Sequence, residues 1–188
     1  PIRVVLADEI DRYPPSAGTE GDPVALATKR SATFHNRKLV LTSTPTIAGN
    51  SRIETAFEQS DQRRFYVSCH DCGEKDYLKW SNVQWPENKP EKAVYVCDHC
   101  GSVWDDATRL RALKEGEWVA NNPDSNIAGF HLSGLYSPWT SLAQAASEFL
   151  RAKQLPETLR VWVNTYLGEV WEDAGEQIDD TFVSDRRE

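Results

Sequence analysis

Two pairs of cysteines with the same spacing are the clearest chemical signal in the sequence. Each pair has the form Cys-x-x-Cys-Gly, first at Cys69 and Cys72 and again at Cys97 and Cys100. Such a turn supplies two thiolates from one tight loop, and two turns complete the four tetrahedral ligands of structural zinc. The glycine after each pair permits the positive φ with which a backbone curls around a metal. The sequence therefore predicts a zinc ribbon with four cysteine ligands.

Two alternatives to this ligand set remain open. The cysteines could form disulfides, although nothing else in the sequence indicates an oxidising compartment. His70 and His99 lie inside the two turns and could replace a cysteine or contact a phosphate group. We favour solvent-exposed loop positions for both histidines. Because four thiolates leave no coordination position for water, the predicted zinc is structural rather than catalytic.

A second candidate site lies where an apolar run ends in two acidic residues. Residues 2–7 are largely apolar and partly β-branched, and Asp8 and Glu9 follow at once. This is the form of a Walker B strand, in which the Asp holds Mg²⁺ and the Glu orients or deprotonates the water that attacks the γ-phosphate of ATP. A solvated strand end is the alternative interpretation.

Hydroxyl side chains end the next apolar run. Residues 38–43 end in Thr42 and Ser43 and run into Thr44 and Pro45. In motor ATPases a polar residue at this place senses the γ-phosphate and couples hydrolysis to movement; a Ser/Thr turn that proline stops is the alternative. A phosphate-binding P-loop, G-x-x-x-x-G-K-S/T, does not occur in the sequence. We therefore expect that this chain alone does not hydrolyse ATP.

The elements that must position these residues can be read from the same pattern. An apolar strand, a loop rich in Pro and Gly, a helix over 24–34 and a second apolar strand form one crossover of a parallel sheet. Ser51 is a candidate N-cap for a short helix over 51–60. The remaining expected elements are strands at 65–67, 77–80, 93–96 and 103–104, helices over 106–114, 141–153 and 157–168, and a strand and turn within 127–136.

Composition and charge limit the class of protein. The chain has 188 residues, a net charge of −8 and 39% hydrophobic residues, which is typical of a globular protein rather than a disordered one. It has no run long and apolar enough for a membrane span and no signal peptide, so we expect neither secretion nor membrane insertion. The first 64 residues carry a net +1, and residues 105–188 carry −7.

Two further sets of residues could contact nucleic acid. The basic candidates for phosphate contacts are Lys29, Arg30, Arg37, Lys38, Arg63 and Arg64. For these we favour solvated surface positions. The sequence also has seven tryptophans, which could stack on bases but more often fill a small core.

The order of several motifs resembles the large terminase subunit of tailed phages, of the lambda-like GpA family. The resemblance covers most of the chain. Its motifs are Val4-Val5-Leu6-Ala7-Asp8-Glu9, Glu20-Gly21-Asp22-Pro23, Leu41-Thr42-Ser43-Thr44-Pro45, Arg64-Phe65-Tyr66-Val67-Ser68-Cys69, Tyr136-Ser137-Pro138-Trp139, and Asn164-Thr165-Tyr166-Leu167-Gly168-Glu169 before Trp171-Glu172.

The resemblance implies an α/β fold: part of a P-loop NTPase parallel sheet with an inserted β zinc ribbon and C-terminal helices. It divides the chain into an ATPase part (1–64), the zinc ribbon (65–104), the helical and strand remainder of the ATPase domain (105–168) and an acidic linker or tail (169–188). Asp8 and Glu9 would be the Walker B residues, and Thr42, Ser43 and Thr44 the coupling motif. No position matches a nuclease carboxylate of the family.

The implied function is that of a fragment of an ATP-driven viral DNA packaging motor whose intact form also cuts DNA. The intact protein would use Mg²⁺ and ATP beside structural Zn²⁺. It would act in the host cytoplasm on double-stranded DNA, as a homo-oligomer with the small terminase subunit and the portal, and not at a membrane. The alternative from another class is a non-catalytic zinc-ribbon module that binds DNA or protein, and a third possibility is an inactive prophage remnant.

Overall fold

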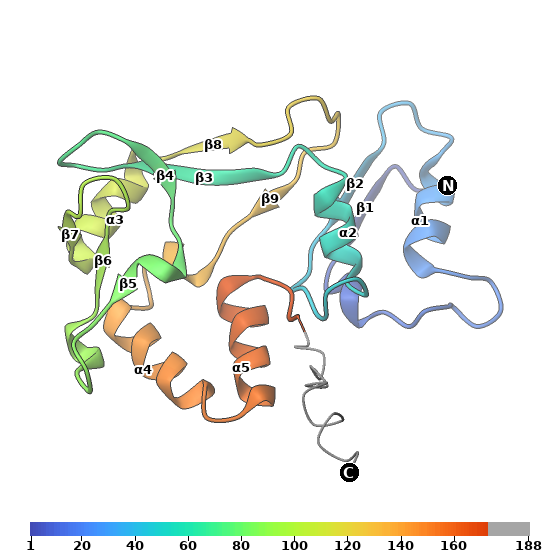
Figure 1. Cartoon of the computed structure of the whole chain (residues 1–188). Coiled ribbons are helices and arrows are strands. Elements are labelled where there is room, and N and C mark those ends of the chain that lie inside the picture. The colour runs from blue at the N-terminus through green and yellow to red at the C-terminus, as the bar shows by residue number, and fades with distance from the viewer. Residues whose placement is uncertain (173–188) are drawn as a thin grey trace, which may run out of the picture.

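The N-terminal region is a parallel pair of strands joined by one helix. The computed structural model describes residues 1–172, a mixed α/β chain of small sheets and short helices (Figure 1). Strand β1 (Val4–Ala7) pairs in parallel with β2 (Lys38–Leu41), with Val4 opposite Lys38. The expected strand–helix–strand crossover is therefore confirmed. The described residues of this sheet form two strands only, and a P-loop sheet is not established.

The crossover helix α1 (Pro23–Ser31) is shorter than expected. It begins as its sequence predicts, because Pro23 occupies the first turn and Asp22 Oδ2 accepts a hydrogen bond from the Ala25 amide at 2.8 Å. The predicted end at residue 34 is wrong. The amide of Phe34 donates instead to the Ser31 carbonyl at 3.1 Å, which makes residues 31–34 a turn.

A second sheet crosses the expected boundary of the zinc ribbon. Strand β3 (Arg63–Ser68) pairs antiparallel with β4 (Lys75–Tyr77) and β8 (Glu117–Ala120), and in parallel with β9 (Phe130–His131). The β8 strand was not among the expected elements. A third sheet has the order β5 (Val83–Gln84), β6 (Val94–Val96) and β7 (Val103–Trp104), all antiparallel.

The strand expected over 77–80 is wrong beyond Tyr77. The backbone amide of Leu78 donates to the Tyr136 hydroxyl at 2.8 Å, and that of Lys79 donates to the Tyr95 hydroxyl at 3.3 Å. Because tyrosine hydroxyls replace a neighbouring strand as acceptors, the chain leaves the sheet. It continues as a 3₁₀ turn, Trp80–Asn82.

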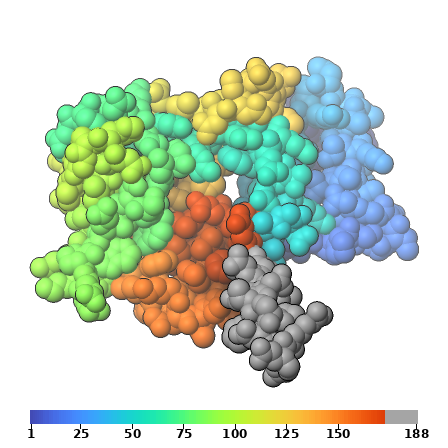
Figure 2. All heavy atoms as spheres, in the orientation of Figure 1, coloured from blue at the N-terminus to red at the C-terminus, as the bar shows by residue number. Residues whose placement is uncertain are grey.

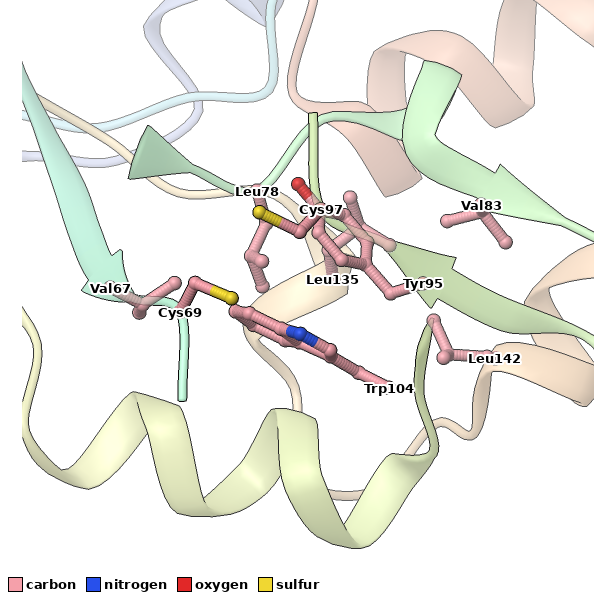
Figure 3. Packing of buried hydrophobic residues seen from close by; sticks show 9 residues of the cluster. All are labelled: Val67, Cys69, Leu78, Val83, Tyr95, Cys97, Trp104, Leu135 and Leu142. Carbon is pink, nitrogen blue, oxygen red and sulfur yellow. The ribbon is translucent and has the colours of Figure 1, made fainter. Parts of the chain in front are cut away.

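The main core lies around the cysteines. Figure 3 shows the buried side chains of this core, with the Cys69 thiol beside the Trp104 indole and the Cys97 thiol near Leu78. The buried members of this core are Val67, Cys69, Leu78, Val83, Tyr95, Cys97, Trp104, Leu135 and Leu142. We call residues 63–104, which supply most of it, the cysteine module.

Three helices pack beside the cysteine module or on one another: α3 (Asp106–Lys114), α4 (Leu142–Ala152) and α5 (Pro156–Trp162), which continues as a π-helical turn, Val163–Leu167. The remaining helix, α2 (Arg52–Glu58), lies beside the β1–β2 pair (Figure 1). The predicted N-cap Ser51 is confirmed, since its hydroxyl accepts from the Glu54 amide at 3.1 Å. Trp80 lies 4.7 Å from the Trp162 ring and joins α5 to the module. No helix among residues 1–172 has the length and apolar character needed to cross a bilayer.

The tryptophans do not all fill the core. Trp104 and Trp162 are buried, in agreement with the expectation, but Trp139 is 89% exposed. The loop that carries Trp139 is held by the buried Arg109 side chain, which donates to the carbonyls of Leu135, Ser137 and Thr140. The exposed ring therefore sits on a loop whose backbone is hydrogen-bonded to a buried side chain on both sides of it.

Candidate metal centre and strand-end site

The four cysteines converge on one point, as the spacing predicts. Their sulfur atoms all lie within 4.8 Å of one another, with Cys69 and Cys100 Sγ 3.7 Å apart and Cys72 and Cys97 Sγ 4.0 Å apart. These separations are far longer than the S–S bond of a disulfide. They match the spacing of about 3.8 Å between sulfurs that each lie about 2.3 Å from a tetrahedral metal. The donor set fits a four-coordinate structural ion.

The two cysteine turns have the same backbone geometry. Gly73 and Gly101 have φ of +77° and +74°, the left-handed conformation that glycine adopts without strain. Each of these glycines donates its amide to the carbonyl of the first cysteine of its own pair at 2.9 Å. The repeated sequence therefore gives a repeated turn, and each turn directs two thiols to the same centre.

The turns also favour thiolate formation at one ligand. Burial raises the pKa of the Cys69 thiol, but the backbone amides of Cys72 and Asp71, together with neighbouring thiols, outweigh it and lower this pKa to about 6. The pKa of the Cys72 thiol is raised, although the Glu74 amide favours its thiolate, because burial and the sulfurs of Cys69 and Cys97 oppose a second negative charge. A cation among the four sulfurs would remove this repulsion.

The histidines inside the turns do not join the cysteine cluster. His70 Nε2 lies 3.4 Å from Asp71 Oδ1, and His99 Nε2 lies 3.9 Å from Asp76 Oδ2. Both side chains are about half exposed. Within residues 1–172 the one group of side chains close enough to hold a metal consists of cysteines alone.

The predicted catalytic carboxylates meet the predicted coupling motif at the carboxyl edge of β1 and β2. The Thr42 hydroxyl donates to Asp8 Oδ1 at 2.5 Å, and the Thr44 hydroxyl lies 3.5 Å from Glu9 Oε2. Ser43 points elsewhere, because its hydroxyl donates to the Thr44 carbonyl and accepts from the Asp11 amide. Two of the three predicted coupling residues thus contact the two predicted Walker B residues.

Glu9 is held in an unusual backbone conformation. Its φ of +52° and ψ of +43° lie in the left-handed region, which costs a non-glycine residue about 1 kcal/mol or more. Its amide donates to Asp8 Oδ1 at 3.0 Å. The chain turns sharply here, so the Asp8 and Glu9 carboxylates both stay at the strand end. Among the described residues, Asp8 Oδ2 has no hydrogen-bond partner and is available to a cation or water.

Two residues of this site were missed from the sequence. The Thr46 hydroxyl donates to Asp11 Oδ2 at 3.0 Å, and Asp11 Oδ1 accepts from the Ile53 amide at the start of α2. Thr42, Thr44 and Thr46 therefore face Asp8, Glu9 and Asp11 in order. The alternation of threonines at every second position was the signal that could have revealed this series.

The basic candidates separate into two groups. Arg63 pairs with Asp61 at 2.7 Å, and Arg64 donates to His131 Nδ1 at 3.2 Å, so both are used inside the protein. The others are Lys29, Arg30, Arg37 and Lys38, and all four are exposed and have no ion pair among residues 1–172. Arg3 joins this group, since its carbonyl accepts from the Lys38 amide at 3.0 Å and its side chain is also exposed and unpaired within the described part of the chain.

A cleft of about 540 Å³ opens beside the coupling motif. Figure 2 shows the hollow between the teal residues of α2 and the red residues near 165–170. Its polar wall includes Thr44, Arg64, His131 and Glu169. Burial, and then the Arg64 charge, lower the pKa of His131, while burial raises the pKa of Glu169. The cleft is lined on one side by the coupling motif and on the other by residues 165–170.

Family models match almost the whole chain. Residues 1–118 match the model described as "Phage terminase large subunit gpA, ATPase domain". Residues 127–188 match the one described as "Terminase large subunit gpA, endonuclease domain". The second match includes residues 173–188, which lie outside the described structure. These residues make up most of the acidic tail expected from the sequence, 169–188.

Curated relatives agree with the family models. The chain is 33% identical to "Terminase, large subunit" of Enterobacteria phage P21 over 98% of its length. It is 30% identical to "Terminase, large subunit" of Escherichia phage lambda over 100% of its length. It spans about a third of the length of each of these relatives. No solved structure was found to match.

Proposed function

We propose, from the premise that this chain belongs to the phage terminase large subunit gpA ATPase-domain family, that its strand-end site is part of an ATP-driven DNA packaging motor. In this proposal Asp8 and Glu9 are the Walker B residues, and Thr42 and Thr44 report on the nucleotide. The observation that carries it is the pair of contacts from these threonines to these carboxylates. A change at the nucleotide that moves either carboxylate would move the β2 end as well.

Mg²⁺ and ATP are the expected cofactors of the intact protein. Asp8 would hold the ion through Oδ2, because Oδ1 already accepts from Thr42 and from the Glu9 amide. The ion, when bound, would neutralise charge on the β- and γ-phosphates. Glu9 would orient or deprotonate the attacking water. The P-loop of the intact protein would have to come from residues beyond this sequence.

The finer fold assignment is also part of the proposal. Strands β1 and β2 leave the apolar side chains of Leu6, Val4 and Val40 exposed. A near-continuous apolar run is typical of a strand in a larger parallel sheet, where further elements would cover these side chains on both faces. We assign residues 1–64 to such a P-loop sheet and 65–104 to a ribbon that binds one structural Zn²⁺. Residues 105–168 would complete the ATPase domain and 169–188 would form an acidic linker or tail; the endonuclease model matches the chain from residue 127 onward.

Double-stranded DNA is the proposed substrate. The exposed basic side chains of Arg3, Lys29, Arg30, Arg37 and Lys38 would contact its phosphates. The intact protein would work as a homo-oligomer with the small terminase subunit and the portal, in the host cytoplasm. The family matches support this assignment in general terms.

The test is ATP hydrolysis by the full-length protein. We expect Asp8→Asn and Glu9→Gln each to reduce the turnover rate by about 10² or more, since general base and metal-binding carboxylates contribute on this scale. Asp124→Asn is the matched control, because Asp124 is exposed and far along the chain from the site. Folded variants with unchanged turnover would favour the alternative, a zinc-ribbon module that binds DNA or protein without catalysis.

A further inference from the structure

The segment after the coupling motif is fastened to the C-terminal end of the described chain. The Thr46 carbonyl accepts two hydrogen bonds, from Asn164 Nδ2 and from the Trp171 amide, both at 2.8 Å. The Ala48 amide then donates to the Trp171 carbonyl at 2.9 Å. These contacts join residues that lie more than a hundred positions apart in the sequence.

Asn164 is the side chain at the centre of this junction. It is 7% exposed, and its single amide group donates to both the Thr46 and the Glu169 carbonyl, each at 2.8 Å. It lies in the π-helical turn Val163–Leu167, a rare conformation that is frequent at functional sites. Gly168 follows with φ of +66° and ends the helix, which brings Glu169 and Trp171 back toward Thr46.

The junction connects the two parts of the chain that match different domains. Thr46 belongs to the segment matched by the ATPase model, and Asn164 and Trp171 belong to the segment matched by the endonuclease model. Thr46 also continues the series of threonines that contact Asp8, Glu9 and Asp11. Hydrogen bonds therefore run from the carboxylates of the strand-end site to Trp171 along one short segment.

We propose that Asn164 is a positioning residue that links the strand-end site to the segment matched by the endonuclease model. A shift of the Thr42–Thr46 segment would move Asn164 and Trp171 with it, because the Thr46 carbonyl is bound to both. This inference rests on the proposed ATPase function for the origin of the shift. The link itself is a property of the described residues and can be tested without nucleotide.

The chemistry of the side chain makes the link specific. Both partners of Asn164 are carbonyl oxygens, so the position requires a donor of two hydrogen bonds. Asp has nearly the same shape but, when ionised, places negative oxygen against these carbonyls. Asn164→Asp therefore breaks the link with little change in volume.

Asn82→Asp is the matched control. Asn82 is equally buried, at 6% exposed, and its amide donates to the Tyr95 hydroxyl at 3.1 Å inside the cysteine module. The same substitution there disturbs a buried hydrogen bond of the cysteine module and touches none of the hydrogen bonds of the junction. Any effect common to both variants reports on stability, and a difference between them reports on the link.

The first experiment is amide hydrogen exchange in the 188-residue chain. In Asn164→Asp we expect the amides of Ala48 and Trp171 to exchange about tenfold faster or more, with exchange in the cysteine module unchanged. Asn82→Asp should show the reverse. If Asn164→Asp does not fold, Asn164→Ser, which introduces no charge, should give the same direction of change. Unchanged exchange at Ala48 and Trp171 in the folded variant would overturn the proposal.

The second experiment measures coupling in the full-length protein with proheads and DNA. We expect Asn164→Asp to hydrolyse ATP at a rate within about twofold of the natural protein, while the DNA packaged per ATP falls about fivefold or more. Asn164→Gln keeps the amide donors and should recover part of this loss. If Asn164→Asp and Asn82→Asp package the same amount of DNA per ATP, the link is overturned. Loss of hydrolysis as deep as in Glu9→Gln would do so too, because Asn164 would then serve the chemistry rather than the coupling. Failure of the ATPase proposal alone would show as full activity in Glu9→Gln and would leave the exchange result standing.

Discussion

The cysteine module and the β1–β2 pair carry the two candidate sites of this chain, and they bury their apolar side chains to very different extents. In the module, Leu78 is 4% exposed and Trp104 is 2% exposed, and both belong to one cluster of buried side chains (Figure 3). In the strand pair, Leu6 is 76% exposed, and Ala7 is the one buried strand residue. The module holds its ligands on a core of its own, whereas the strand pair holds its carboxylates mainly through hydrogen bonds.

This difference shows that a functional motif and a stable core need not coincide. The cysteine ligands would supply folding energy directly when a metal binds, because the site forms only in the folded chain. The Asp8 and Glu9 site is preserved by contacts from Thr42 and Thr44, whose net contribution to stability is modest. Measurements of stability should therefore detect damage to the module far more readily than damage to the strand pair.

Metal removal is expected to have the largest effect. We predict about one zinc per chain by elemental mass spectrometry, with four thiols that react only after chelation. Chelation should unfold the module, since zinc binding contributes on the order of 10 kcal/mol in small zinc domains. Hydrogen exchange at Cys69 and Cys97 should then become fast.

The strand pair supplies the internal control for chelation. The Thr42 amide donates to the Ala7 carbonyl at 2.9 Å, and its slow exchange should persist after the metal is removed. A chain that contains no metal, or two disulfides, and still has a folded module would contradict the assignment of the four cysteines.

A matched pair of leucines gives the next largest effect. Leu78→Ala should lower the free energy of unfolding by about 2–5 kcal/mol, because it leaves a cavity in the core. Leu6→Ala should change it by less than about 0.5 kcal/mol in the same chain, since the side chain is exposed. Urea denaturation followed by tryptophan fluorescence measures both. Equal losses would show that the two regions share one core after all.

The pH dependence of the cleft gives the smallest effect. Burial lowers the pKa of His131 below its ordinary 6.5, and the Arg64 charge adds to this. The unfolded chain then binds a proton more readily than the folded one, so stability is complete above pH 6.5 and falls as the pH drops from there toward the folded-state pKa. Glu169 has the opposite effect on stability. Because burial raises its pKa, its contribution to stability is present below pH 4.5 and is lost as the pH rises from there.

Comparison with His131→Gln isolates this contribution. Between pH 7.5 and 5.5 the natural chain should lose more stability than the variant, because only the natural chain carries the His131 imidazole, which binds a proton more readily when the chain is unfolded. Urea titrations at the two pH values provide the measurement. Identical losses in both chains would show that His131 is not held neutral by its surroundings.

Local sequence rules succeeded where short-range geometry decides the outcome. The Cys-x-x-Cys-Gly repeats, the N-caps Asp22 and Ser51, and the parallel crossover were all predictable, because each depends on a few neighbouring residues or on one hydrophobic pattern. The end of α1 and the strand at residues 77–80 were not. The prediction of a strand at residues 77–80 failed because the tyrosine hydroxyls that accept hydrogen bonds from the Leu78 and Lys79 amides come from distant segments.

The sequence by itself determined the chemistry: four thiols with zinc spacing, two carboxylates at a strand end, and hydroxyls at the end of the next strand. Tertiary structure alone decided which hydroxyl meets which carboxylate, that Arg64 binds His131, and that Asn164 fastens Thr46 to the far end of the chain. The physical reason is that ligand spacing and strand ends are set by covalent neighbours. The other contacts join residues up to 118 positions apart and exist only after the chain has packed.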